Sequence, residues 1–372
     1  MVDHRVDTLA KNIVNYSCNL QPGENILFET FGNDCDTILK ALIREAYAAG
    51  GHPFVWRRDN TIQRELLRGL SQEQAELMAK NDAQLMEQMD AFVTVRSVNN
   101  SAELSDVPAN NKDIYNAVYT DSVHSNLRIP KTKWCALRFP NNAIAQSAGM
   151  SIDAFEDYFF SVCNLDYSKM KDAMEPLKEL MERTDKVHIY GPYTDLSFSI
   201  KGMPAIKCAG WTNIPDGEIF TAPVKDSING VITFNTPSVF EGFRFENVRL
   251  EFKNGRIVNA SANDTELLCS ILDRDEGARS VGEFAFAVNP FVNFPLGDIL
   301  FDEKICGSIH FAIGNCYKNC DNGNHSSIHW DLISRQTPEF GGGKILFDDV
   351  LIRKDGLFVL PELQALNPEN LK

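Results

Sequence analysis

Residues 24–56 read ENILFETFGNDCDTILKALIREAYAAGGHPFVW, and this stretch decides the fold of the first half of the chain. Glu24 to Glu29 is a short apolar run that follows a Pro-Gly turn, which is typical of a buried strand. Cys35 to Ala49 carries apolar residues at helical spacing and ends at a Gly-Gly pair, and residues 53–56 form a second apolar run. A strand, a helix and a second strand in this order predict a parallel sheet flanked by helices.

The same alternation continues beyond this stretch. Ser71 to Met89 is rich in Glu, Gln and Ala and predicts a helix, and Asp90 to Val95 predicts a third strand. A helical segment from Ser151 to Arg183 is expected to close this half. We therefore expect an α/β N-terminal domain with a mainly parallel sheet over residues 1–185.

From Lys186 the pattern changes to short strands separated by Gly, Pro, Asn and Asp turns. The pair VRLEF and RIVNA around Lys253-Asn254-Gly255 is a hairpin signal, because Asn-Gly suits a two-residue turn. One helix is expected over about Asp264 to Ser280. These features predict an α+β C-terminal domain over residues 186–372, built mainly on antiparallel sheet and carrying the metal site described below.

Composition excludes several classes of protein. The net charge of −15 argues against a general nucleic-acid or anionic-membrane binder, so neither partner is expected. The N-terminal residues carry charges throughout and lack the apolar region of a secretory signal, and no apolar run approaches the length of a membrane span. Nine scattered cysteines without a signal peptide favour reduced thiols and a cytoplasmic location.

Residues 307–331, GSIHFAIGNCYKNCDNGNHSSIHWD, carry the most informative chemistry. His329 and Asp331 are two residues apart in an apparent strand, so their side chains share one face while Trp330 takes the other. A polar pair of this kind needs a strong partner when it is buried, and a divalent metal ion is such a partner.

Two other strands repeat this design. His310 alternates with Ile309 and Phe311, and Glu283 lies among small alanines on a face opposite its phenylalanine neighbours. Spacing alone leaves a metal site and ordinary satisfied strand residues about equally supported. Glu218, after a Pro-Asp-Gly turn, reads by itself as the first residue of an ordinary strand.

Segments in both halves resemble the aminopeptidase T family of metallo-aminopeptidases, which includes AmpS and PepS. The similarity covers nearly the whole chain in order and spacing. The segments that carry it are LQPGENILFE (20–29), EAYAAGGHPFV (45–55), AQSAGMSIDAFEDYFF (145–160), IPDGEIFTAPV (214–224), EGARSVGEFAFAVNP (276–290), ILFDEKICGSIHFAIGNCY (299–317) and NHSSIHWD (324–331).

The resemblance implies two divalent metal ions, with Zn²⁺, Co²⁺ and Mn²⁺ all suited to the ligand set. Tyr317 matches a family tyrosine beside the metals, as a phenolate ligand or as a hydrogen-bond donor to the reacting carbonyl. Glu303 is a candidate general base from its position before His310, against the alternative of a surface charge paired with Lys304. Glu283 or Asp331 is the expected bridging carboxylate. The implied metal ligands are Glu218, Glu283, His310, His329 and Asp331.

The expected reaction is metal-assisted hydrolysis that removes N-terminal residues from short peptides with a free amine. The family also implies a homodimer whose active sites face an internal cavity. A metal-dependent amidase acting on non-peptide substrates and a non-catalytic metal-binding homologue remain as alternatives. Rejection of N-acetylated substrates would distinguish an aminopeptidase from a general amidase.

Other motifs give weaker evidence for a functional site. Cys316 and Cys320, like Cys306, are better explained as small buried thiols than as a structural zinc site or a nucleophile, because no second cysteine pair or Cys–His pair completes either. His325 is expected to be solvated. The glycines at 341–343 do not match a phosphate loop, and no dinucleotide fingerprint follows the first strand.

Overall fold

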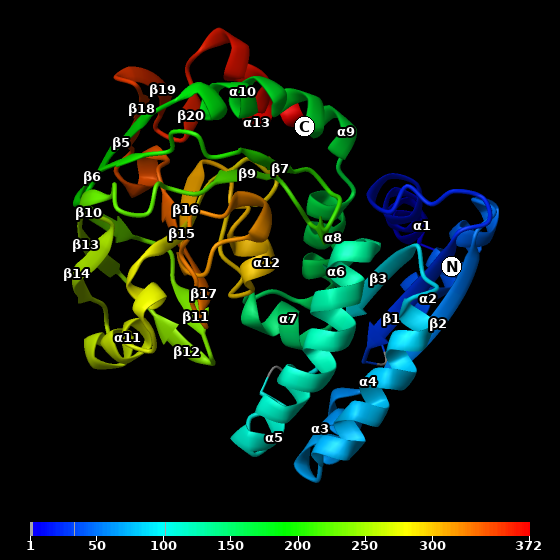
Figure 1. The fold of residues 1–372 in the computed structure, drawn as a ribbon. Helices are drawn as coiled ribbons and strands as arrows, with labels where there is room; N and C mark the ends of the chain where they lie inside the picture. The colour runs from blue at the N-terminus through cyan, green and yellow to red at the C-terminus, as the bar shows by residue number, and fades with distance from the viewer. Residues whose placement is uncertain (1–2, 33, 101) are drawn as a thin grey trace. The chain divides into compact units, whose positions relative to one another are not determined.

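The computed structural model describes residues 3–32, 34–100 and 102–372. The chain forms two compact units, drawn in Figure 1. The first unit comprises Met1–Asn164 with Gly210–Ile214, and the second comprises Leu165–Ala209 with Pro215–Lys372. Within the described ranges, no helix combines the length and apolarity that crossing a membrane requires.

A five-stranded sheet forms the centre of the first unit, in the order β2-β1-β3-β4-β8. Every neighbouring pair in it is parallel, which confirms the α/β fold predicted for this part of the chain. The last strand, β8, comes from far along the sequence. The elements are α1 His4–Lys11, η1 Asn12–Ser17, β1 Asn25–Phe31, α2 Asp36–Ala48, β2 His52–Arg58, α3 Asn60–Arg68, α4 Gln72–Met86, β3 Ala91–Arg96, α5 Ala109–Ile114, η2 Tyr115–Arg128, α6 Ile129–Lys131, β4 Lys133–Arg138, α7 Asn142–Ser147, α8 Ile152–Cys163 and β8 Asn213–Ile214.

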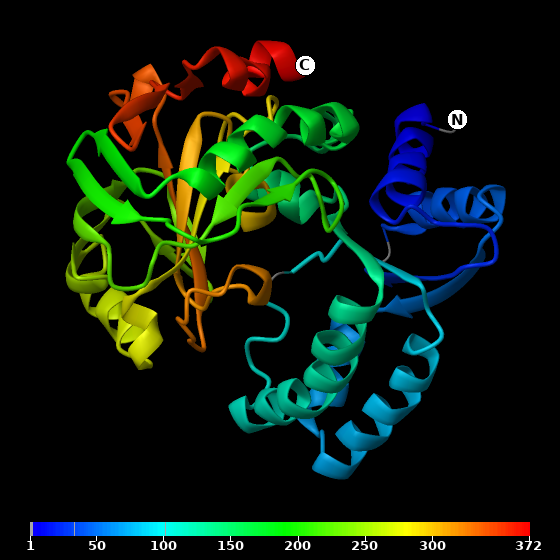
Figure 2. The ribbon, with the colours of Figure 1, turned by 45° about the horizontal axis from the view of Figure 1, so that its top comes forward.

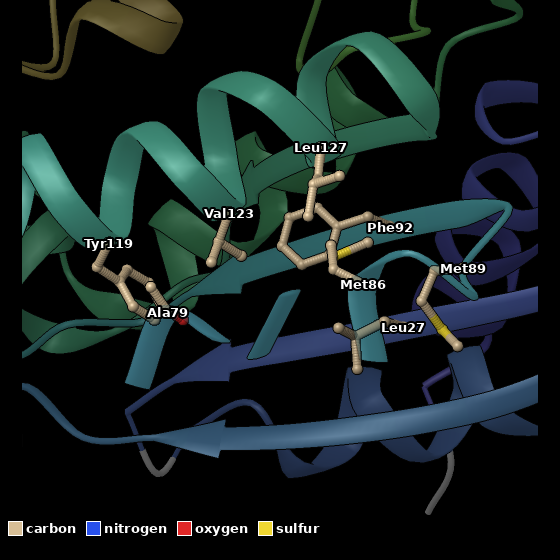
Figure 3. Packing of buried hydrophobic residues seen from close by; sticks show 8 residues of the cluster. All are labelled: Leu27, Ala79, Met86, Met89, Phe92, Tyr119, Val123 and Leu127. Carbon is tan, nitrogen blue, oxygen red and sulfur yellow. The ribbon is translucent and has the colours of Figure 1, made fainter. Parts of the chain in front are cut away.

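Two long helical segments pack against one another and against this sheet. Helix α4 and the π-helical segment η2 run side by side (Figure 2). Their apolar faces meet Leu27 of β1 and Phe92 of β3, as Figure 3 shows, and the whole cluster is buried. Burial of this apolar surface is what holds the helices to the sheet.

The second unit is built on two antiparallel sheets and a small hairpin. The larger sheet has the order β14-β13-β10-β6-β5-β18-β19-β20, and the smaller has the order β17-β16-β15-β9-β7. The predicted antiparallel character is therefore confirmed. The strands are β5 Lys186–Gly191, β6 Thr194–Ser199, β7 Ile206–Cys208, β9 Glu218–Thr221, β10 Asn229–Phe234, β11 Ser238–Phe240, β12 Phe243–Phe245, β13 Val248–Lys253, β14 Arg256–Ser261, β15 Val281–Ala287, β16 Ser308–Gly314, β17 His329–Arg335, β18 Lys344–Phe347, β19 Val350–Lys354 and β20 Leu357–Phe358.

Helices border these sheets. They are α9 Tyr167–Ala173, α10 Glu175–Arg183, α11 Thr265–Leu272, η3 Glu276–Arg279, α12 Ile299–Asp302, η4 Lys318–Cys320, η5 Pro338–Phe340, η6 Pro361–Leu366 and α13 Pro368–Leu371. The helix expected over Asp264–Ser280 is therefore shorter and is followed by the separate turn η3.

Aromatic side chains join the two sheets of this unit face to face. Phe198 of β6 packs edge-on against Phe284 of β15 and Phe311 of β16, with ring centroids 5.1 Å and 5.5 Å away. Phe286 of β15 meets Phe347 of β18 in the same way. Since successive strand residues point to opposite faces, the residues between these phenylalanines project from the other face of the smaller sheet.

The segment Ser151–Arg183 is not one helix and does not belong wholly to the first unit. It divides into α8, α9 and α10. The first break occurs because Asp166 leaves helical geometry and caps α9 by accepting from the backbone of Ser168 and Lys169. The last two helices group with the second unit, where both contact η6. The division of the chain by contacts thus differs from the boundary predicted near residue 185.

Candidate metal centre

The free face of the smaller sheet in the second unit carries a cluster of carboxylates and imidazoles. Register places Ala312 of β16 directly between Glu283 of β15 and Asp331 of β17. Ala287 lies opposite Glu218 of β9, so small side chains separate the charged ones. The strands β15, β16 and β17 are neighbours in the sheet (Figure 1). Their polar side chains therefore share one face and are separated by small residues.

Glycines make the local backbone geometry possible at two points. A β-bulge interrupts the pairing of β15 with β16 at Gly282, where a Cβ atom would lie 2.3 Å from the carbonyl oxygen of Asn315. Gly217, with φ of +130°, precedes Glu218 and lies against Asn289. Both glycines are next in sequence to a predicted ligand, so they direct Glu283 and Glu218 onto the site face.

The five predicted ligands lie together in two overlapping groups. Potential ligand atoms of Glu218, Glu283 and His310 all lie within 4.8 Å of one another. The same holds for Glu283, His329 and Asp331. Glu283 is common to both groups, with Oε1 at 3.6 Å from His310 Nε2 and Oε2 at 3.5 Å from His329 Nε2. Its two carboxylate oxygens thus face two different histidines.

Several buried polar atoms in the cluster fit a cation. Glu218 Oε2, His310 Nδ1 and His329 Nε2 have no hydrogen-bond partner among the described residues. Buried polar groups are normally paired, so the unpaired Glu218 Oε2 and His329 Nε2, which both face the cluster, point to a missing partner. His310 faces Glu218 and Glu283 with Nε2, not with the unpaired Nδ1. His329 Nδ1 lies 2.8 Å from the carbonyl oxygen of Asn315 and must donate to it, which leaves the Nε2 lone pair for a metal ion.

The concentration of carboxylates in the cluster also favours the binding of cations. Burial raises the pKa of Glu283, and the nearby charge of Glu218 adds to this effect. Burial alone would lower the pKa of His310, but its contact with the Glu283 carboxylate and the charge of Glu218 outweigh burial and raise it to about 9. A bound divalent ion would take the place of this proton and satisfy the same carboxylates.

Tyr317 lies at the border of the cluster. Its ring centroid is 4.9 Å from that of His329 and 5.3 Å from that of Phe220. About half of the residue (47%) is exposed, so the site opens to solvent at this point. Tyr317 is therefore beside the candidate ligands, as the sequence predicts.

Glu303 also belongs to the cluster, at the end of α12. Its Oε1 lies 2.6 Å from the Nζ of Lys304, so Glu303 and Lys304 do form the expected ion pair. The pair is not at the surface, because Lys304 is completely buried. Burial raises the pKa of Glu303 to about 8, against the lowering effect of Lys304. A carboxyl group in this range can exchange a proton near neutral pH.

The sequence did not point to three further members of the cluster. Lys304 Nζ lies 2.7 Å from Glu218 Oε1 and 3.7 Å from Asp216 Oδ1, and Cys208 groups with these two carboxylates. Asp216 was read as part of a turn and is fully buried. The sequence named Lys304 only as a surface partner of Glu303, and its position between apolar Phe301 and Ile305 is ordinary at the end of a helix.

The other sequence motifs lie outside this cluster. His325 is exposed, as predicted. Cys316 and Cys320 are buried, and all nine cysteines are free thiols. Cys316 donates to Asp321 and groups with Asp321 and His325, whereas Cys320 donates to the carbonyl oxygen of Pro204, so the two cysteines do not share a group of ligand atoms.

Comparisons with known proteins agree with this geometry. A family model described as thermophilic metalloprotease (M29) matches residues 2–357. Aminopeptidase PepS of Streptococcus thermophilus is 26% identical over 386 residues, which cover 88% of this chain and 91% of PepS. Aminopeptidase T of Thermus aquaticus is 32% identical over 176 residues, which cover 40% of this chain and 43% of that protein.

Solved structures share the fold. Wild-type AmpT from Thermus thermophilus matches with a TM-score of 0.80 and 21% identity, over 96% of this chain and 99% of that one. The 2,5-dihydroxypyridine dioxygenase of Pseudomonas putida KT2440 matches with a TM-score of 0.64 and 12% identity, over 96% and 98%. At these identities the likeness concerns the fold alone, and the fold hosts more than one chemistry.

Proposed function

The chain belongs to the thermophilic metalloprotease family M29, and from that premise we propose that it removes N-terminal residues from short peptides at a centre of two divalent ions. Membership of this family, whose named relatives are aminopeptidases, makes it a metallo-aminopeptidase of the hydrolase class. The observation that carries the proposal is the pair of ligand groups that overlap at Glu283.

The proposed ligands divide between the two ions. Glu218, Glu283 and His310 would hold one ion, and Glu283, His329 and Asp331 would hold the other. Glu283 is the better candidate for the bridge than Asp331, because only its carboxylate belongs to both groups. Zn²⁺, Co²⁺ and Mn²⁺ all suit carboxylate and imidazole ligands. When bound, the ions would supply Lewis acidity that polarises the scissile carbonyl and lowers the pKa of a water molecule.

The chain's own residues would handle protons and orient the substrate. Glu303 Oε1 is held by Lys304, so its second oxygen is the one proposed to accept a proton from the attacking water and return it to the leaving amine. The Tyr317 hydroxyl is proposed to donate a hydrogen bond to the developing oxyanion.

Two further properties are proposed on indirect support. A cytoplasmic location is consistent with nine free cysteines. A homodimer whose active sites face an internal cavity rests on the family resemblance, and light scattering coupled to gel filtration would test it by giving the mass of the particle.

The assay that tests the function uses metal-stripped protein on leucine p-nitroanilide and on its N-acetyl analogue, with and without added Zn²⁺ or Co²⁺. Cleavage of the free-amine substrate alone, restored by metal, is the expected result. Cleavage of both substrates would favour the metal-dependent amidase. No cleavage in spite of stoichiometric metal binding would favour a non-catalytic metal-binding protein.

A further inference from the structure

A completely buried lysine lies inside the proposed metal centre. Lys304 is 0% exposed, and its Nζ lies 2.7 Å from Glu218 Oε1, 2.6 Å from Glu303 Oε1 and 3.7 Å from Asp216 Oδ1. A buried ammonium group is tolerated only where such partners surround it. Lys304 therefore neutralises part of the negative charge on which the proposed ions would depend.

The positive charge of Lys304 acts on the Glu218 end of the cluster. Glu218 Oε1 pairs with Lys304, and Glu218 Oε2 lies 3.3 Å from His310 Nε2. At the other end, Asp331 Oδ1 lies 3.6 Å from His329 Nε2. Among the described residues, no lysine or arginine forms an ion pair with Asp331 or Glu283.

We propose that the two ion subsites are unequal and fill in a fixed order. The Asp331 subsite (Glu283, His329 and Asp331) takes the first ion, and the Glu218 subsite (Glu218, Glu283 and His310) takes the second and weaker one. The reason is electrostatic, because Lys304 already uses one Glu218 oxygen and places a positive charge next to the second subsite, where it opposes a further cation. This inference rests on the proposed two-ion centre.

Lys304 is therefore a positioning residue, and its charge determines how strongly the Glu218 subsite binds its ion. At limiting metal concentration the protein would hold one ion in the Asp331 subsite, and activity that needs both ions would follow occupancy of the Glu218 subsite. Since opposing charges at close range in a buried site change affinity strongly, we expect the two dissociation constants to differ by about tenfold or more.

The first experiment assigns the two binding steps. The metal-stripped full chain is titrated with Co²⁺, and binding is followed by visible absorption and by the metal content after dialysis. The wild type should bind two ions in separate steps, His310→Ala should keep the tight step, and His329→Ala should keep the weak step. Equal steps, or the opposite assignment, would overturn the inference alone. Binding of fewer than two ions by the wild type would overturn the two-ion centre and the inference with it.

The second experiment tests the lysine directly. Lys304→Met removes the charge and should narrow the gap between the two dissociation constants by about tenfold, whereas Lys304→Arg should keep it. Lys178→Met is the control, because Lys178 pairs with Glu182 on the surface helix α10. An unchanged or wider gap in a folded Lys304→Met protein, judged by circular dichroism, would contradict the inference. If this variant does not fold, Lys304→Gln, which removes the charge but keeps a hydrogen-bond donor for Glu218 and Glu303, takes its place with the same expected result.

Discussion

Glu283 is the residue on which most of the proposed chemistry depends. It is 2% exposed, lies at the centre of the cluster and faces both histidines. We expect Glu283→Gln to lower kcat/KM by about 100-fold or more, because a neutral amide cannot bridge two cations. The variant should also bind fewer than two ions, which metal analysis after dialysis would measure. Glu266→Gln on the exposed face of α11 is the matched control, and unchanged activity in Glu283→Gln would refute the assignment.

Asp275 links acid stability to the strand that carries His329 and Asp331. Its carboxylate accepts from the backbone and hydroxyl of Ser327 and caps η3 at Ala278. The hydrogen bonds from Ser327 lower the pKa of Asp275 to about 2. A depressed pKa in the folded state means that this stabilisation is complete above pH 4 or so and is lost as the pH falls toward 2.

The corresponding variant is Asp275→Asn, examined by denaturant unfolding at several pH values. It should be less stable than the wild type at pH 7, and the difference should shrink as the pH falls from about 4 to 2, because the wild type is then losing the same interaction. A difference that does not depend on pH would mean that the charge of Asp275 contributes nothing.

Residue types and their spacing predicted part of the ligand cluster. His310, His329 and Asp331 stood out because each interrupts an apolar alternation, and Glu283 stood out for the same reason. Lys304 could not be predicted, since the three carboxylates around it come partly from distant segments at 216 and 218. A lysine near the end of a short helix is usually solvated, and only the long-range packing makes it a buried one.

At the scale of elements, the β-bulge in β15 determines how Glu283 is presented. Gly282 lies at the bulge, and an added Cβ would approach the Asn315 carbonyl to 2.3 Å. We expect Gly282→Ala to cost about 2 to 3 kcal/mol of unfolding free energy and to weaken metal binding, because the strand must shift to accommodate it. Gly69→Ala is the control, since nothing lies within 4 Å of that position. Equal stability of the two variants, measured by thermal or denaturant unfolding, would show that the bulge tolerates a side chain.

Periodicity predicted single elements better than their ends. The strands that begin with Asn25, His52 and Ala91 were each found within a few residues, because apolar runs and Pro-Gly signals are local. The break at Asp166 was missed, because a continuous apolar periodicity runs across it and the cap acts over only two or three residues.

For the whole molecule, the sequence predicted two domains of different class but not how segments are exchanged between them. Gly210–Ile214 adds β8 to the parallel sheet of the first unit, although its neighbours in sequence belong to the second. The helices α9 and α10 were assigned to the first domain because they follow its last helix. Their partners, among them the Glu175–Lys207 ion pair, lie in segments that come later in the chain. Such long-range pairing is not encoded in local periodicity.

Metal binding should therefore act on one unit. All proposed ligands lie in the second unit, on β9, β15, β16 and β17. A ligand that binds only the folded state stabilises it by about 4 kcal/mol when present at about 1,000 times its Kd, which slows hydrogen exchange through global opening of that unit by up to about 1,000-fold. Adding Zn²⁺ to metal-stripped protein should protect peptides from these four strands.

Hydrogen–deuterium exchange read by mass spectrometry would resolve this effect by segment. Peptides from β1 and β3 at the centre of the parallel sheet should exchange at the same rate with and without Zn²⁺, because no proposed ligand lies in that unit. Glu283→Gln should lose most of the metal-dependent protection. If the parallel sheet were protected as strongly as the site strands, metal binding would also stabilise the first unit, and the prediction would be wrong. If no segment were protected, the metal centre itself would be contradicted.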